Sequence, residues 1–322
     1  MMTPRENFFH FLRGEPIEWT PIIDDQLVFM PEMIPENVAR GFVEQQKPFT
    51  GSFGGPDNFG IEWEFVPSVG GSMVRPGKPY LDEIEEWEEK VKFPDLDSWD
   101  WEGCAKENAE FLNTDKIIRT TIFTGYFERL IALLDFEGAA MALFDEDEQP
   151  CVHALFEKLT DLYIDMIRRM KKYFNVEFVE IHDDWGNQRS LMFSEETHRE
   201  MILPYVKRLV AAAHAEGVYM EQHSCGKIEK LLPNMIETGI DTWTGQKSVI
   251  DKHMLVDTYG DRFKFAVEIR PDGPVDDATA MKMVEDAYEE WKGKNVWFID
   301  RSFFTPDQKK MIADYVHQRG VL

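Results

Sequence analysis

Residues 218–226 read Val-Tyr-Met-Glu-Gln-His-Ser-Cys-Gly, an apolar run that ends in a histidine and a cysteine two residues apart. A helical pattern stops at Gly217, just before this run, so a strand is expected here. Imidazole and thiolate groups are ligands that zinc accepts. His223 and Cys225 are therefore candidate metal ligands, although half-buried His and Cys residues also occur as ordinary core residues.

Strand-like and helical segments alternate on both sides of this stretch. The helical patterns include a long helix over 148–173, with Leu and Met at helical spacing, a helix interrupted near Pro204, and a closing helix over 306–316. The expected strands include 19–23, 117–123, 176–181, 218–222, 240–243, 263–269 and 296–299. Repeated strand-helix units with about eight strands predict an α/β fold, a TIM (β/α)8 barrel.

The first third of the chain is expected to elaborate this barrel. Residues 4–13 follow a cap candidate, begin with proline and end at Gly14, which predicts a short helix. Residues 61–66 alternate like a half-buried strand that could pair with 72–75, and 82–92 form an acidic amphipathic helix. Nothing marks a domain boundary, so we expect one domain over 1–322, with the helix, loop and acidic connector elaborations within 1–115.

Composition excludes several classes of function. The 322 residues carry 35 Lys and Arg against 60 Asp and Glu, a formal net charge of −25. This excess repels nucleic-acid phosphates and anionic lipid, so no nucleic-acid or membrane partner is expected. No apolar run is long enough to span a membrane, no signal-peptide core is present, and three scattered cysteines do not form a disulfide framework. A cytoplasmic protein is expected.

Polar residues follow many of the expected strands. The carboxyl ends of barrel strands share one face, and that face holds the active site. The candidates there are Tyr126, Asp183, Asp184, His223, Cys225, Gln246 and Glu268. Asp183 and Asp184 could instead cap a turn, and Tyr126 and Gln246 are chosen from position alone.

Three motifs resemble the uroporphyrinogen decarboxylase superfamily. They are Glu-Ile-His-Asp-Asp-Trp-Gly at 180–186, Leu-Pro-Tyr at 203–205 and His-Ser-Cys-Gly at 223–226. Weaker matches at 13–15, 93–97 and 239–241 extend the resemblance over nearly the whole chain. The chain is most similar to the cobalamin-dependent methyltransferase branch, which includes methylcobamide methyltransferases and components of corrinoid O-demethylases. The arginine-rich signature of the decarboxylase proper is absent.

The resemblance implies a catalytic zinc held by His223, Cys225 and a later cysteine. Residues 298–306 contain no cysteine. A carboxylate could replace the thiolate, with Glu268 as the first choice and Glu221 or Asp183 next. Glu268 could instead orient His223 from outside the ligand set.

The function implied is zinc-dependent methyl transfer between a small O- or N-methylated compound and the cobalt of a separate corrinoid protein. Asp183, Asp184 or Tyr126 would act as acids, and Gln246 would contact the substrate. Trp185, Phe303 and Phe304 are candidate walls for a methoxyaromatic ring, although Trp185 could equally serve packing. A metal-free decarboxylase and a barrel that binds a small molecule without catalysis are the alternatives.

Overall fold

The computed structural model describes residues 1–68, 70–75, 77–246, 248–300 and 303–322. The chain divides into two compact units. Unit 1 comprises Met1–Leu27, Thr114–Ile117 and Asp241–Leu322, and unit 2 comprises Val28–Asn113 and Ile118–Ile240. The expectation of a single domain over 1–322 stays a prediction.

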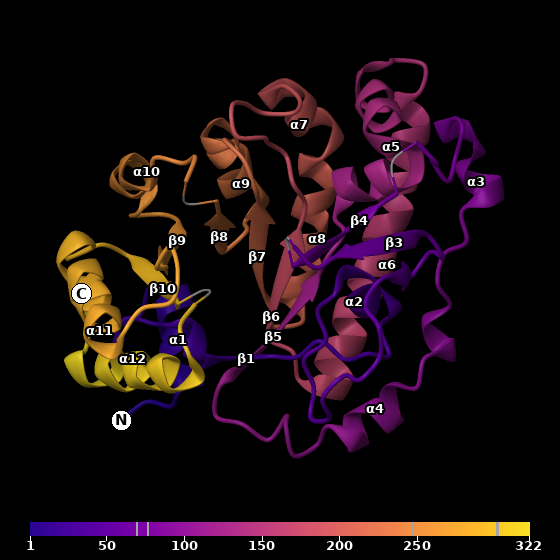
Figure 1. Cartoon of the computed structure of the whole chain (residues 1–322). Helices are drawn as coiled ribbons and strands as arrows, with labels where there is room; N and C mark the ends of the chain where they lie inside the picture. The colour runs from indigo at the N-terminus through magenta and orange to yellow at the C-terminus, as the bar shows by residue number, and fades with distance from the viewer. Residues whose placement is uncertain (69, 76, 247, 301–302) are drawn as a thin grey trace. The chain divides into compact units, whose positions relative to one another are not determined.

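Unit 2 is built on three parallel strands and the helices that follow them. Its principal elements are β5 (Ile117–Ile122), α5 (Tyr126–Phe144), α6 (Gln149–Phe174), β6 (Phe178–His182), α7 (Glu195–Met201), α8 (Leu203–Ala215), β7 (Tyr219–Ser224), η4 (Glu229–Leu231) and α9 (Leu232–Thr238). Strand β5 pairs with β6 and β6 pairs with β7, all parallel. Helices α6 and α8 pack against each other beside these strands (Figure 1). The order of strands and helices is that of an α/β fold.

The register of β6 and β7 decides which side chains meet. Glu180 pairs with Glu221, and His182 pairs with His223. Because side chains two residues apart on a strand point to the same face, both pairs lie on one face of the sheet. On this face, the pair Glu180 and Glu221 therefore lies next to the pair His182 and His223, on the side nearer the start of the strands.

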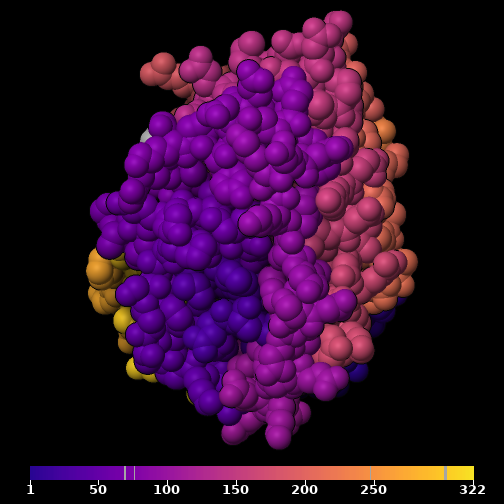
Figure 2. Space-filling model, turned by 90° about the vertical axis from the view of Figure 1, so that its right-hand side faces the viewer, coloured from indigo at the N-terminus to yellow at the C-terminus, as the bar shows by residue number. Residues whose placement is uncertain are grey.

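The N-terminal part of unit 2 is an irregular layer with a small antiparallel sheet. Figure 2 shows that the indigo-to-purple part of the chain makes up most of the face turned to the viewer. Strand β3 pairs antiparallel with β2 and β4. The elements here are β1 (Gln26–Val28, shared with unit 1), α2 (Pro35–Arg40), β2 (Gly55–Pro56), β3 (Glu62–Val66), β4 (Gly71–Val74), η2 (Ile84–Glu86), α3 (Trp87–Lys90), η3 (Leu96–Ser98) and α4 (Trp101–Glu107).

Unit 1 repeats the parallel strand-helix pattern. Strand β9 pairs in parallel with β8 and with β10. The elements are α1 (Pro4–Arg13), η1 (Ile23–Asp25), β8 (Thr242–Gly245), α10 (Lys252–Tyr259), β9 (Lys264–Ile269), α11 (Asp277–Glu290), β10 (Val296–Asp300) and α12 (Pro306–Arg319). A parallel bridge joins Ile22 to Phe298 of β10. Among the described residues, no helix is both long and apolar enough to cross a membrane.

Most expected elements are confirmed, and two expectations were wrong. Thr3 caps α1 through a capping box, and the helix near Pro204 breaks between α7 and α8. The strand expected at 19–23 is only the bridge at Ile22, because the chain turns at once into the 3-10 helix η1. The acidic helix expected over 82–92 is shorter, a 3-10 turn followed by the four residues of α3.

Candidate functional site

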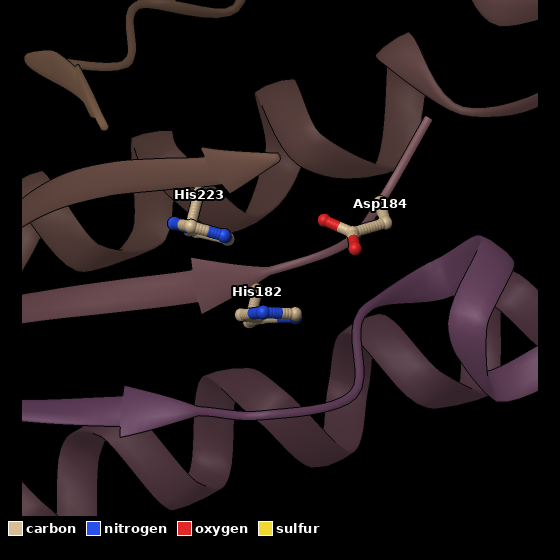
Figure 3. Close-up of side chains that lie close together, drawn as sticks. All are labelled: His182, Asp184 and His223. Carbon is tan, nitrogen blue, oxygen red and sulfur yellow. The ribbon is translucent and has the colours of Figure 1, made fainter. Parts of the chain in front are cut away.

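Two histidines from neighbouring strands form the centre of the candidate site. His182 ends β6 and His223 lies near the end of β7 (Figure 3). Their rings are stacked, with centroids 4.4 Å apart and an interplanar angle of 15°. The parallel register of the two strands produces this stacking, because His182 and His223 are direct partners in the ladder.

A carboxylate completes a group of possible metal ligands. One donor atom from each of His182, Asp184 and His223 lies within 4.8 Å of the others, and all three residues are partly buried. The backbone N–H of Cys225 donates to Asp184 Oδ1 at 2.6 Å and so fixes that carboxylate. Cys225 Sγ lies 3.5 Å from His223 Nε2, which places the thiol beside the group.

Glu128, near the start of α5, orients His182. Its Oε2 lies 2.8 Å from His182 Nδ1, and Arg40 Nη2 lies 3.8 Å from its Oε1. Burial disfavours a charged His182, but the carboxylate of Glu128 outweighs burial, so the pKa of His182 is raised. Burial likewise works against the Glu128 carboxylate, yet His182 and Arg40 lower its pKa. Burial and the charge of Glu128 raise the pKa of Asp184.

Two glycines let the loops after β6 and β7 touch. Gly226 has φ +86°, and a Cβ atom placed on it would lie 2.2 Å from the carbonyl carbon of Gly186. Both the positive φ and the close approach require glycine. The N–H of Lys227 donates to the carbonyl of Asn187 at 2.8 Å across the same contact. The final glycines of the Asp-Asp-Trp-Gly and His-Ser-Cys-Gly motifs thus hold Asp184 and Cys225 in one place.

Asp183, a predicted acid, lies outside this group and caps α5. It is fully buried and accepts hydrogen bonds from the backbone N–H groups of Tyr126, Phe127 and Glu128 at 2.8–3.1 Å. Trp185 Nε1 donates a fourth bond at 2.9 Å. Burial and the nearby Glu128 raise the pKa of Asp183 to about 7, against the four donors that favour the carboxylate. These contacts account for Asp183 as a helix cap, and its catalytic role stays a prediction.

Tyr126 and Trp185 are both core residues. The Tyr126 side chain is fully buried, and its hydroxyl lies 3.0 Å from Thr160 Oγ1. Burial raises the pKa of Tyr126 well above its usual range. Trp185 is 1% exposed and packs edge-on against His198, at 4.5 Å between ring centroids. Packing accounts for both residues, and their roles in catalysis and substrate binding stay predictions.

The other predicted site residues belong to unit 1. Glu268 lies on β9 and Gln246 follows β8, both half-buried. Phe303 is 48% exposed, whereas Phe304 is buried. The possible ligand group in unit 2 does not contain Glu268. Its role as a ligand and the substrate contacts of Gln246, Phe303 and Phe304 stay predictions.

Sequence reasoning missed His182 and Glu128 as members of the site. A signal for His182 was present, because Glu180-Ile181-His182 and Glu221-Gln222-His223 repeat the pattern Glu-x-His at the ends of two consecutive strands. Parallel neighbours with one repeated pattern bring like residues side by side. Glu128 had no such signal, because its contact depends on where α5 starts relative to β6.

The donor set fits a catalytic zinc ion. Two imidazoles and a carboxylate are a common three-ligand set that leaves the fourth position open. Metal-bound histidines usually donate their other ring N–H to a carboxylate, and His182 has this partner in Glu128. Cys225 could join as a further ligand or stay beside the ion. The chemistry of these donors therefore suits a Lewis-acidic metal ion.

Comparison with known proteins first defines the class of fold. A methyltransferase from Methanosarcina mazei has a similar structure, with a TM-score of 0.67 over 99% of both chains and 13% sequence identity. A sugar phosphate isomerase/epimerase from Parabacteroides distasonis (TM-score 0.36, 8% identity, 69% of this chain and 80% of that chain) and a zinc-bound IolI protein (0.37, 12%, 69% and 79%) are too distant to carry an argument. No curated protein matches the chain. The predicted α/β fold of the TIM-barrel type is confirmed.

The family match is more particular than the fold. Residues 127–257 match the family described as uroporphyrinogen decarboxylase (URO-D). This segment contains His182, Asp184, His223 and Cys225. The predicted resemblance to the URO-D superfamily is confirmed over this segment, and the fold of the whole chain is shared with the Methanosarcina mazei methyltransferase.

Proposed function

We propose that the protein is a zinc-dependent methyltransferase that moves a methyl group between a small O- or N-methylated compound and the cobalt of a corrinoid protein. The observation that carries this proposal is the cluster of His182, Asp184 and His223, with His182 oriented by Glu128. The URO-D match and the fold shared with a methyltransferase support it. Neither observation identifies the substrate.

Each residue of the cluster has a defined task in this proposal. His182, Asp184 and His223 would hold zinc, which supplies Lewis-acid polarisation of the leaving oxygen or nitrogen when bound. Glu128 keeps His182 in the tautomer whose Nε2 is free to bind metal. The Cys225 N–H keeps the Asp184 carboxylate turned toward the histidines. The chain thus fixes the ligand geometry before the substrate arrives.

The partner and location follow from the same reasoning. In the proposed reaction a separate corrinoid protein supplies the cobalt that gives or takes the methyl group. A surface with net charge −25 favours a partner with a basic face. None of the three cysteines forms a disulfide bond among the described residues, which agrees with the proposed cytoplasmic location.

Metal analysis and a corrinoid assay test the proposal together. The wild-type chain should contain zinc near one equivalent by elemental analysis. His182→Ala, His223→Ala and Asp184→Asn should each lower zinc content and slow methylation of cob(I)alamin by at least about 100-fold. His214→Ala, at an exposed histidine of α8, is the matched control and should change neither quantity.

Two results would overturn the proposal. One is zinc content unchanged in all three ligand variants. The other is no spectral change of cob(I)alamin with methoxyarenes, methanol and methylamines. A metal-free decarboxylase is the second candidate, favoured by the description of the matched family. Release of carbon dioxide from an acid substrate without any corrinoid would establish it.

A further inference from the structure

A cavity in unit 2 opens beside the candidate metal site. The cavity measures about 340 Å³, within the range for small-molecule sites. Helix α2, the β3–β4 hairpin and α5 form its walls. The lining includes Glu128, which contacts His182 directly, and Arg40, which contacts Glu128. A molecule in this cavity would therefore lie one side chain away from the histidine cluster.

The walls of the cavity are mainly apolar and include two aromatic rings. Trp63 and Phe136 both line it, together with the apolar side chains of Met73 and Ile131. The Arg40 guanidinium lies 4.5 Å from the Trp63 ring centroid. Phe136 is 50% exposed in the cavity wall, so its ring can contact a bound molecule. Flat rings are the natural occupants of such walls.

The charge of the lining is the second feature. Arg40, Arg75 and Lys78 line the cavity against two acids, Glu128 and Asp135, so the lining carries one excess positive charge. The whole chain carries −25. Arg75 and Lys78 are exposed at the rim, and Arg75 has only the exposed Glu64 as an ion-pair partner among the described residues. An anionic group on the occupant would meet these cations.

The wall also contains an unmatched polar atom and a distorted backbone. The Ser72 hydroxyl is buried and has no hydrogen-bond partner among the described residues. Asp135 interrupts α5 with φ +63° and ψ 179°, a region that residues other than glycine rarely adopt. The kink lies next to Phe136 in the cavity wall.

We infer that this cavity binds the methyl-bearing substrate, and that this substrate is an aromatic ring with an anionic substituent such as a carboxylate. That the bound molecule carries a transferable methyl group rests on the proposed function. Its aromatic and anionic character is inferred from the cavity alone. The ring lies between Trp63 and Phe136, the anionic group faces Arg75 and Lys78, and the opposite end of the molecule is the end nearest the histidine cluster. In this binding mode the aromatic residues that contact the substrate are Trp63 and Phe136, not the sequence-predicted Trp185, Phe303 and Phe304.

Binding of two probes to the full chain tests the inference. The probes are 4-methoxybenzoate and the uncharged methoxybenzene, with affinities measured by calorimetry at low salt. 4-Methoxybenzoate should bind at least about tenfold more tightly than methoxybenzene. Lys78→Glu and Arg75→Glu should each weaken binding of 4-methoxybenzoate roughly fivefold. Met73→Trp should abolish it by filling the cavity.

Matched variants keep the test specific. Lys106→Glu changes the same charge at an exposed site of α4, and Met141→Trp adds the same ring at an exposed site of α5 outside the cavity. Both should bind 4-methoxybenzoate like the wild type, and circular dichroism should show that every variant is folded. Equal affinity for the two probes, or undiminished binding in folded Met73→Trp, would overturn the inference.

The two proposals fail in different ways. Tight, charge-dependent binding of 4-methoxybenzoate without any methylation of cob(I)alamin would support the cavity and count against the methyltransferase. Methylation from a neutral donor that is unaffected by Met73→Trp and Lys78→Glu would support the methyltransferase and overturn the cavity assignment.

Discussion

Two buried arginines of unit 2 each hold a pair of carboxylates, and the surroundings of the two clusters differ. Arg129 on α5 contacts Glu36 and Asp57, each at 2.5 Å. Every oxygen of these two carboxylates has a donor: Asn58 reaches Glu36, and the backbone N–H groups after Asp57 and the Trp63 indole reach Asp57. This cluster, which we call the α5 clasp, ties the N-terminal segment of unit 2 to the helix that carries Glu128.

The second cluster consists of Arg119 on β5 with Glu180 and Glu221 on the next two strands. Arg119 donates to Glu180 Oε2 and, at 2.6 Å, to Glu221 Oε1. Glu221 Oε2 is buried without a hydrogen-bond partner among the described residues. The two glutamates lie on the same sheet face as His182 and His223, one layer earlier. In the α5 clasp every carboxylate oxygen has a donor, although Arg129 Nε has no hydrogen-bond partner among the described residues, and this cluster stabilises the fold. The cluster with the open Glu221 oxygen lies against the candidate site, where such departures are expected.

Removal of Arg129 should have the largest effect on stability. Arg129→Met leaves two carboxylates buried without their cation, which typically costs about 3–5 kcal/mol. We expect a loss of this size in the free energy of unfolding, measured by urea denaturation. Arg168→Met removes an arginine with an exposed ion pair and should change stability little. Similar losses in both variants would contradict the special role of the clasp.

Acidification should weaken the region around the site through His198. This histidine is fully buried against Trp185, its Nε2 has no partner among the described residues, and burial lowers its pKa from 6.5 to about 3. Because the unfolded chain binds a proton at His198 below pH 6.5 and the folded chain does not, stability is complete above pH 6.5 and falls as the pH drops toward 3. Between pH 6.5 and 5 the loss should be about 2 kcal/mol.

Variants separate His198 from the other titrating groups. His198→Leu removes the proton-binding site and should flatten the pH dependence of the unfolding free energy between pH 6.5 and 5. His214→Leu, at an exposed histidine, should leave the slope as it is in the wild type. A slope that persists unchanged in His198→Leu would show that another group is responsible.

The sequence predicted elements well where local signals agree. The capping box at Thr3, the alternation that gives β3 and the Leu and Met spacing of α6 all lie within one segment, and each element formed. The segment at 19–23 failed because apolar composition alone does not distinguish a strand from a bridge before a turn. Local patterns therefore predicted the class of fold, but not where each strand ends.

The site was harder to predict, because its contacts join segments far apart in the sequence. His223 and Cys225 were named from one motif. The Glu128–His182 contact joins residues 54 positions apart and depends on where α5 starts relative to the end of β6. Asp183 and Asp184 are neighbours with the same chemistry, yet one caps α5 and the other faces the histidines. Both residues lie in the loop after β6, and a sequence does not say which of two neighbouring loop residues faces the site.

The smallest expected effect tests the incompletely satisfied cluster directly. Glu221→Gln keeps an amide oxygen that can accept from Arg119. It removes a carboxyl group whose pKa burial raises to about 7 and whose second oxygen has no partner among the described residues, so stability should change by about 1 kcal/mol or less. Asp57→Asn is the matched change in the α5 clasp. Both Asp57 oxygens accept hydrogen bonds, so an amide N–H₂ there must face a donor, and the loss should be clearly larger. Urea denaturation of the two variants at one pH measures the difference. Equal losses would mean that the open oxygen of Glu221 is satisfied in solution and that the contrast between the two clusters does not hold.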